Sequence, residues 1–305
     1  MNVSVIICTY NRCRSLETAL ESLSASVMPD STQWEVVVAD NNSSDDTRRV
    51  AEGFCRRDPA RFRYLFEPTQ GKSYALNTAV RESRGEILAF TDDDVIFDPN
   101  WLSNLTGTLA GGEYGGAAGR ILPSQSLDPP RWLALEGKYN LIGVVCPYFE
   151  PGKTAHDLKE PPFGANMAFR REMFSKYGEF RVDLGPSSKS RVLGEDTEFA
   201  RRLMSRGERI RYTPSATVYH EIHQDRINKD YFLYWWNGLG KGSVRESSRN
   251  LSAGQAFKIL GRGLVTALEG LVSFNPQRRF YCKCRVWFSA GKLTEAFQRA
   301  WNISR

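Results

Sequence analysis

The chain has 305 residues, of which 41% are hydrophobic and 25% are charged, a composition that excludes a disordered or low-complexity protein. Residues 241–305 contain 12 Lys and Arg against 3 Asp and Glu, a net of +9, whereas residues 1–240 contain 29 against 32, a net of −3. The basic C-terminal segment favours an anionic partner, such as a membrane surface, a phospholipid or a polyprenyl phosphate. No nucleic-acid motif accompanies these basic residues, so we expect no nucleic-acid partner.

The cysteines and the apolar runs indicate where the protein works. None of the six cysteines belongs to a zinc-type CxxC pair, which favours reduced thiols in the cytosol. The first apolar run starts at residue 3, so we expect no targeting segment. A run of about 18 apolar residues is also missing, so we expect no spanning helix. These features predict a cytoplasmic protein. Binding of the basic segment to the membrane would make it a peripheral protein on the inner face.

Over the first hundred residues, apolar runs alternate with amphipathic segments. Strands are predicted at residues 3–9, 35–39, 62–66 and 86–90, and helices at residues 15–23, 44–57 and 74–81. Strands separated by helices pair in parallel through right-handed crossovers, which predicts an α/β fold. Ligands of such a sheet bind at the carboxyl ends of its strands.

The rest of the chain is less regular. Helices are predicted at 99–110, 171–177, 196–206 and 254–273, strands at 115–122, 166–169, 210–212 and 216–219, and loops at 123–162 and 185–190. The helix at 254–273 has an apolar face formed by Phe257, Leu260, Leu264, Leu268 and Leu271. We expect a domain over 1–225, divided at residue 122, and a basic, amphipathic helical extension over 226–305.

Acidic residues occur where two predicted strands end and where a later helix begins. Asp40 follows the strand at 35–39, a run of three acids (Asp92, Asp93 and Asp94) follows the strand at 86–90, and Glu195 with Asp196 opens a helix. Clustered carboxylates suit Mg²⁺ or Mn²⁺, which also bridge diphosphate oxygens. The structural alternatives are an Asx turn at Asp40 and capping acids at the helix start.

Six segments together resemble the inverting glycosyltransferases of family 2, which have the GT-A fold. They are residues 5–12 (VIICTYNR), 38–47 (VADNNSSDDT), 71–77 (GKSYALN), 90–94 (FTDDD), 164–170 (GANMAFR) and 194–199 (GEDTEF). The resemblance covers about residues 1–220. It implies a Rossmann-like, mostly parallel central sheet flanked by helices. The Gln-x-x-Arg-Trp motif of processive polysaccharide synthases is missing, which favours transfer of a single sugar.

The resemblance also implies roles for particular residues. Residues 1–122 would bind the nucleotide-diphosphate sugar, which we expect to be a UDP-sugar, and residues 123–225 would bind the acceptor. Donor-binding residues would be Thr9, Tyr10, Asn11, Arg12, Asp40, Asn42, Gly71, Lys72, Asn77, Asp92 and Asp93. Mn²⁺ or Mg²⁺ would be bound by Asp94, Asp92 and His220. Asp196 would be the general base, and Glu195 would position or contact the acceptor.

Several alternatives remain open at this point. Lys72 is as well explained as an exposed lysine, and His220 as a structural histidine, with His223 a weaker candidate ligand. For the whole chain, the favoured function is transfer of one sugar to a hydroxyl of a cell-envelope or exopolysaccharide precursor, a glycan or lipid-linked acceptor. A sugar-nucleotide nucleotidyltransferase and a catalytically inactive sugar-binding scaffold are the rivals. A nucleotidyltransferase would have a glycine-rich, phosphate-binding loop after the first strand. Residues 9–12 contain no glycine, which disfavours this alternative.

Overall fold

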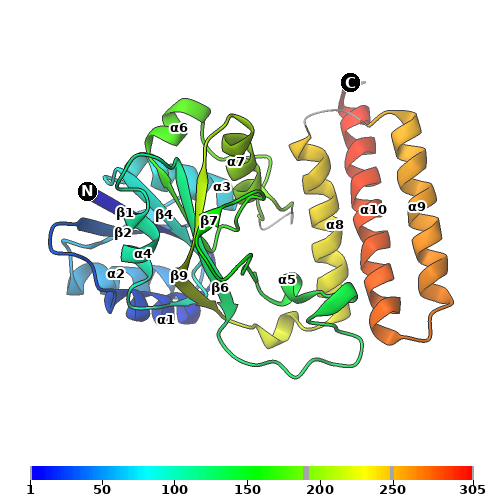
Figure 1. Ribbon diagram of the computed structural model, residues 1–305, viewed down its shortest axis with the longest axis horizontal. Coiled ribbons are helices and arrows are strands. Elements are labelled where there is room, and N and C mark those ends of the chain that lie inside the picture. Colours follow the sequence, from blue (N-terminus) through cyan, green and yellow to red (C-terminus); the bar gives the residue numbers. More distant parts are fainter. Residues whose placement is uncertain (1, 188–191, 248–250, 304–305) are drawn as a thin grey trace. The chain divides into compact units, whose positions relative to one another are not determined.

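The computed structural model describes residues 2–187, 192–247 and 251–303 (Figure 1). The chain forms two compact units. The first, here called the sheet unit, comprises Met1–Gln125, Pro147–Val182 and Glu195–Glu221. The second, the helical unit, comprises Ser126–Cys146, Asp183–Gly194 and Ile222–Arg305. Part of the loop expected at 185–190 lies outside the described residues.

Within the described residues, the sheet unit has one mixed sheet of nine strands with the order β3-β2-β1-β4-β8-β6-β9-β5, and β7 pairs with β9. The strands are β1 (Asn2–Thr9), β2 (Gln33–Asp40), β3 (Phe62–Phe66), β4 (Ile87–Thr91), β5 (Val95–Phe97), β6 (Gly116–Pro123), β7 (His156–Asp157), β8 (Asn166–Arg170) and β9 (Ile210–His220). The first four strands are parallel, as expected. Strand β8 is antiparallel to both of its neighbours, β4 and β6, so the pairing of the sheet changes from parallel to antiparallel at β8.

Two layers of helices cover this sheet because successive side chains of each strand point to opposite faces. Val3, Val5 and Ile7 of β1 join the core under α1 (Cys13–Ser24), α2 (Thr47–Arg57) and α4 (Trp101–Gly107). Ile6 of β1 joins a second core, under α3 (Lys72–Glu82), α6 (Glu172–Tyr177) and α7 (Glu195–Ser205). The strands therefore run buried on both faces, which explains their near-continuous apolar sequence.

The two strands predicted at 210–212 and 216–219 form the single strand β9, which contains a bulge. Opposite β6, Gly119 pairs with Thr213 but Arg120 pairs with Thr217, so β9 has three extra residues there. Asn166 of β8 fills the bulge: its Nδ2 donates to the carbonyl oxygens of Arg120 and Ala216, at 2.9 Å each. The asparagine of the 164–170 segment thus satisfies backbone groups that a bulge leaves without ladder partners.

The helical unit is built mainly from α8 (Lys229–Glu246), α9 (Ala253–Leu271) and α10 (Pro276–Ile303), and α10 lies between the other two (Figure 1). Short elements complete it: η1 (Gly137–Tyr139), α5 (Ile142–Val145) and η2 (Gln224–Arg226). Its core includes Leu133, Phe232 and Phe280. Among the described residues, no helix is both long and apolar enough to cross a membrane.

The apolar face predicted at 254–273 is present on α9, but it does not face a core. Its members are exposed: Phe257 (73%), Leu260 (48%), Leu264 (60%), Leu268 (62%) and Leu271 (74%). The opposite side of α9 packs on α10 through glycines. A Cβ at Gly270 would lie 2.9 Å from Cβ of Cys282, so a larger residue would push the two helices apart.

Candidate active site

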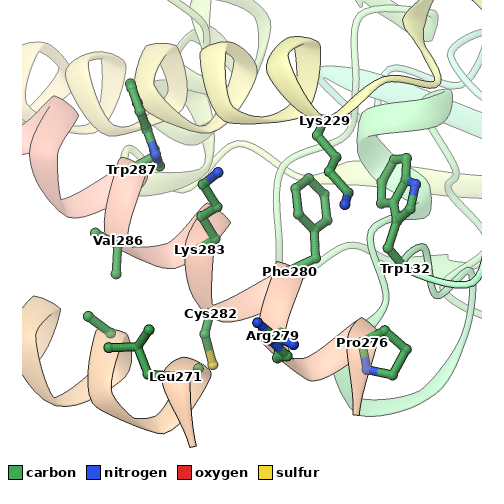
Figure 2. Close-up of a pocket in the computed structure, with 12 residues that line it drawn as sticks. Trp132, Lys229, Leu271, Pro276, Arg279, Phe280, Cys282, Lys283, Val286 and Trp287 are labelled. Carbon is green, nitrogen blue, oxygen red and sulfur yellow. The ribbon is translucent and has the colours of Figure 1, made fainter. Parts of the chain in front are cut away.

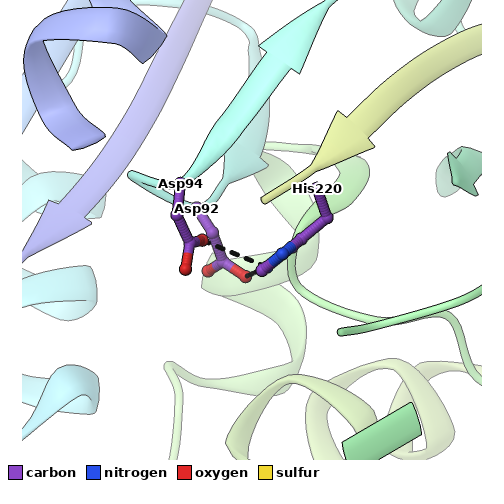
Figure 3. Close-up of side chains that lie close together, drawn as sticks. All are labelled: Asp92, Asp94 and His220. Atoms are coloured by element: carbon purple, nitrogen blue, oxygen red, sulfur yellow. Dashed lines mark ion pairs between the residues drawn. The ribbon is translucent and has the colours of Figure 1, made fainter. Parts of the chain in front are cut away.

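Three potential metal ligands meet where β4 ends and β5 begins. Asp92 and Asp94 lie in the turn between these strands, and β5 is antiparallel to β9 with Val95 opposite His220. This register brings His220 to the acids although it is more than a hundred residues away in sequence (Figure 3). Nε2 of His220 lies 3.0 Å from Oδ1 of Asp94 and 3.8 Å from Oδ2 of Asp92. One ligand atom from each residue lies within 4.8 Å of the others.

The hydrogen bonding of His220 leaves its Nε2 facing Asp92 and Asp94. Its Nδ1 lies 2.9 Å from the carbonyl oxygen of Glu221, and a carbonyl can only accept, so Nδ1 carries a proton. Burial disfavours the imidazolium, but Asp94 and Asp92 outweigh burial and raise the pKa of His220 to about 10. Two carboxylates and an imidazole held by a carbonyl form a donor set that fits a divalent cation, which would replace the Nε2 proton.

Two cations balance the acids of this turn. Nη1 of Arg12 lies 3.0 Å from Oδ1 of Asp93 and also pairs with Asp94. Nζ of Lys72 lies 2.8 Å from Oδ1 of Asp92. Burial opposes ionisation of Asp92, but Lys72 and His220 outweigh burial and lower the pKa of that carboxyl. Burial, reinforced by Asp94, raises the pKa of Asp93, although Arg12 acts in the opposite direction.

Lys72 is therefore part of the charged site and not an ordinary surface lysine. It stands at the first position of α3, directly after Gly71. Its Nζ also lies 3.7 Å from Oε1 of Glu195, so one ammonium connects the acidic turn to the start of α7. A lysine in this position can meet an incoming phosphate as a point charge, because its present partners are carboxylates that a divalent cation would neutralise.

Asp40 lies at the end of β2, beside Thr9 at the end of β1. The Asp40 carboxylate accepts hydrogen bonds from the backbone N–H of Ser43 and from the hydroxyl of Tyr64, both at 2.9 Å. The bond to Ser43 reaches three residues along the chain, whereas the Asx turn expected as the structural alternative would reach two. Both strands end at the edge of the sheet where ligands bind in α/β proteins, so the geometry also suits the predicted donor contacts.

The loops after β1 and β2 are held together by asparagines. Asn11 and Asn42 have positive φ values of 52° and 64°, a conformation that asparagine tolerates better than most residues. Oδ1 of Asn11 accepts from the backbone N–H of Ser44 at 2.7 Å, which ties the two loops to each other. Tyr10 is exposed beside this contact. These contacts join the segment 9–12 to the loop after β2.

Asn41 was not predicted from the sequence as a site residue, and it positions the loop before Lys72. Its Oδ1 accepts from the backbone N–H of Gly71 at 2.8 Å, and its Nδ2 donates to the carbonyl oxygen of Thr69 at 2.7 Å. Gly71 has a φ of 143°, which favours glycine. Asn77 has a comparable positioning contact, since its amide exchanges two hydrogen bonds with the backbone of Phe180. A donor contact by Asn77 stays a prediction.

Glu195 and Asp196 begin α7 but have different surroundings. Glu195 is only 4% exposed, and burial together with Asp196 raises its pKa to about 7, against the opposing effect of Lys72. Asp196 accepts from the backbone N–H groups of Gly164 at 2.6 Å and Thr197 at 2.7 Å. A Cβ at Gly164 would lie 2.9 Å from Oδ2 of Asp196, so this glycine permits the contact. No pattern in the sequence indicates this role of Gly164.

Comparison with known proteins shows which family this chain resembles. The family model for glycosyl transferase family 2 matches residues 4–178. The succinoglycan biosynthesis protein ExoM of Rhizobium meliloti (strain 1021) is 28% identical over 229 residues, which are 75% of this chain and 69% of that protein. The glucosyl-dolichyl phosphate glucuronosyltransferase of Haloferax volcanii is 25% identical over 247 residues, 79% of this chain and 76% of that protein.

A solved structure has a similar fold. The mannosyltransferase PcManGT from Pyrobaculum calidifontis, determined in complex with GDP-Man and Mn²⁺, superposes with a TM-score of 0.66 at 17% identity. The match covers 97% of this chain and 87% of that one. At this identity the likeness concerns the fold, which confirms the predicted GT-A architecture. The matching family and the Haloferax volcanii relative are glycosyltransferases by name, which decides the reaction class against the nucleotidyltransferase alternative.

Proposed function

Because the chain belongs to glycosyl transferase family 2, we propose that it is a metal-dependent, inverting glycosyltransferase that transfers one sugar from a nucleotide-diphosphate sugar. The donor is a UDP-sugar, and the acceptor is a hydroxyl of a cell-envelope or exopolysaccharide precursor. The observation that carries this proposal is the group formed by the half-buried Asp92 with the buried Asp94 and His220, next to Lys72 and Glu195 at the carboxyl end of β4.

Asp94, Asp92 and His220 would hold the cation, which is Mn²⁺ or Mg²⁺. Mg²⁺ is bound in proteins mainly through oxygen, so the imidazole in this donor set favours Mn²⁺. When bound, the cation supplies positive charge that stabilises the departing diphosphate. Lys72 and Arg12 pair with the carboxylates of this turn, and both side chains could bind phosphate oxygens when those carboxylates hold a cation.

Thr9 and Asp40 would hold the base and ribose of the nucleotide, helped by the loop residues Tyr10, Asn11 and Asn42. Asp93 lies beside Arg12 and would contact the ribose together with Asp92. In this arrangement residues 1–122 bind the donor and residues 123–225 the acceptor. The positions of Thr9 and Asp40 at the ends of β1 and β2 support this assignment, because ligands of such a sheet bind at the carboxyl ends of its strands.

Asp196 would remove the proton from the acceptor hydroxyl, and Glu195 would position the acceptor. The two N–H groups that donate to Asp196 fix the orientation of its carboxylate, and general-base catalysis requires such alignment with the hydroxyl. Attack from the face opposite the diphosphate, in one displacement, inverts the configuration at the anomeric carbon. Measuring the anomeric configuration of the product by NMR tests the proposal, and a retained configuration would contradict it.

The names of the relatives guide the choice of acceptor. One acts in succinoglycan biosynthesis and another is named for a glucosyl-dolichyl phosphate. A lipid-linked precursor is therefore the favoured acceptor class. An enzyme with such an acceptor works at a membrane, and the net charge of +9 over residues 241–305 would attract it to an anionic inner surface.

The donor is identified by thermal shift, because a ligand that binds only the folded protein stabilises it. UDP- and GDP-sugars are compared in the presence of Mn²⁺, and the best ligand is then tested for release of free nucleoside diphosphate with an acceptor extract. Stabilisation by a UDP-sugar, followed by acceptor-dependent release of UDP, is expected. Stabilisation by GDP-mannose alone would overturn the UDP assignment, and binding without any turnover would favour the sugar-binding scaffold.

A further inference from the structure

The helical unit contains a cavity of about 620 Å³ that the proposed transfer chemistry does not use. Its walls come from α9, α10, the first residue of α8 and Trp132 (Figure 2). The volume lies within the range of small-molecule sites, roughly 300–1,000 Å³. The cavity is therefore large enough to hold a ligand.

One part of the cavity wall is apolar. Trp132 and Phe280 form it with Leu271 and Val286, and the rings of Trp132 and Phe280 are 4.6 Å apart between centroids. Leu271 also ends the exposed apolar face of α9, so apolar surface continues from the outside of the helix into the cavity. A contiguous exposed apolar surface of this kind usually marks a contact with another molecule or with a membrane.

Three cations line the same cavity. They are Lys229, Arg279 and Lys283, and all three are exposed. Figure 2 shows Lys229 reaching from α8 towards Phe280 and Trp132. Among the described residues, no carboxylate lies within ion-pair distance of these three side chains, whereas the neighbouring Arg278 lies 3.5 Å from Glu269. The cations at the cavity are thus available to an anion from outside.

We propose that this cavity binds one anionic lipid, with the phosphate at Lys229, Arg279 and Lys283 and the adjoining hydrocarbon chain against Trp132, Phe280 and Leu271. Apolar walls alone would suit any hydrophobic molecule, and cations alone any anion, whereas an anionic group joined to a long chain uses both. The lipid is either a bilayer phospholipid or a polyprenyl phosphate, since the two share this chemistry. The inference deepens the proposed action at a membrane but does not depend on the transfer reaction.

A monomeric probe tests the combination of charge and chain. Dodecyl phosphate, kept below the concentration at which it forms micelles, is titrated into the full chain by calorimetry. Inorganic phosphate provides the charge without the chain, and dodecyl maltoside the chain without the charge. We expect saturable binding of one dodecyl phosphate per chain and much weaker binding of the other two. Equal binding of either control compound would overturn the proposal.

Variants then locate the site. Arg279→Glu with Lys283→Glu should weaken dodecyl phosphate binding roughly tenfold or more, because two charge-assisted contacts become repulsive. Lys258→Glu with Arg262→Glu is the matched control, since it changes the charge of the same unit equally on exposed α9 residues that do not line the cavity. Ala267→Trp fills the cavity without changing its charge and should also prevent binding. Equal losses in both double variants, or normal binding by a folded Ala267→Trp protein, would refute a defined site.

Vesicles identify the source of the lipid. Phosphatidylcholine vesicles containing either phosphatidylglycerol or a polyprenyl monophosphate are compared for displacement of bound dodecyl phosphate. Displacement by either supports the proposal and names the source, and displacement by neither overturns it. Transfer to a water-soluble acceptor is measured with the unmodified protein. Transfer without binding of dodecyl phosphate would remove only this inference, while binding of dodecyl phosphate without transfer would remove only the proposed function.

Discussion

The sheet unit and the helical unit treat charged and apolar side chains in opposite ways. The sheet unit buries Asp94, His220 and Glu195 and pairs each with a neighbour of opposite charge, while its apolar side chains fill two cores. The helical unit leaves Leu264 and Leu268 of α9 exposed and places Lys283 and Arg279 at a cavity without described carboxylate partners. Each unit thus departs from the ordinary arrangement in a different respect.

Both arrangements lower the stability of the folded chain, which indicates that each serves a function. Burying a charge costs free energy unless the charge is paired and hydrogen-bonded, and an apolar pair of the same size is often more stable. Exposing a row of large apolar side chains forgoes the stabilisation that their burial would give. Neither arrangement improves the fold by itself. The buried charges suit a cation and a diphosphate, and the exposed apolar face suits a lipid surface.

Removal of the metal should have the largest effect. Excess EDTA should abolish transfer, and added Mn²⁺ should restore it, because the buried carboxylates would otherwise remain paired with Arg12 and Lys72. Asp94→Asn keeps the size of the side chain but removes an anionic ligand. It should weaken Mn²⁺ binding in calorimetry and lower turnover roughly 10²-fold, the usual effect of losing one electrostatic contact to a transition state. The exposed Asp30→Asn is the control, and full activity in EDTA would contradict the metal assignment.

The general base should give the next largest effect. Asp196→Asn retains a hydrogen-bond acceptor for the N–H of Gly164 but cannot take up a proton, so kcat should fall roughly 10²-fold or more while donor binding changes little. Single-turnover rates and donor affinity are measured together. Near-normal turnover in Asp196→Asn, combined with a large loss in Glu195→Gln, would reverse the roles within the pair.

The sequence was sufficient for much of the sheet unit. Strand β3 has the predicted bounds, and the other early strands agree within a few residues, because strands buried on both faces have apolar runs that end in polar turns. Asp40 and the acidic turn were located for the same reason. Strand β5 was missed because three residues carry too little periodicity, and the pairing of Val95 with His220 could therefore not be anticipated.

Other features could not be predicted because they depend on contacts between distant segments. Gly164 permits the contact with Asp196, and Asn41 holds the N–H of Gly71, yet each is a common turn residue when read alone. The periodicity of 254–273 shows that one face of the helix is apolar, but not what covers that face. Packing of the opposite side of α9 on α10 leaves the apolar face exposed, and no local pattern determines that choice.

A smaller effect concerns stability and pH. The pKa of Glu195 is raised from 4.5 to about 7, so the folded protein holds this proton more tightly than the unfolded chain does. Stability therefore declines as the pH rises from about 4.5 to 7, and the cost is fully present above 7. Glu195→Gln removes the ionisation. Measured in EDTA, its Tm should exceed that of the unmodified protein by a few degrees at pH 8, with a smaller difference at pH 4.5.

The control for this measurement is Glu17→Gln, which makes the same substitution at an exposed glutamate of α1. A Tm advantage of Glu195→Gln that is equal at both pH values would show that shape, and not ionisation, determines the effect. That result would also weaken the comparison between the units, because the sheet unit would then contain no costly charge at this position.

The smallest expected effect is the loss of stability when the apolar face of α9 is made polar. Leu264→Ser and Leu268→Ser should each change the free energy of unfolding by no more than about 0.5 kcal/mol, because both side chains are already exposed. Leu141→Ala, in the core of the same unit, should cost about 2–5 kcal/mol. The double serine variant should nevertheless bind anionic vesicles more weakly in co-sedimentation, since exposed leucines contribute to membrane affinity by entering the interface. A large loss of stability would mean that this face is covered within the protein, and unchanged vesicle binding would leave the basic residues alone responsible for it.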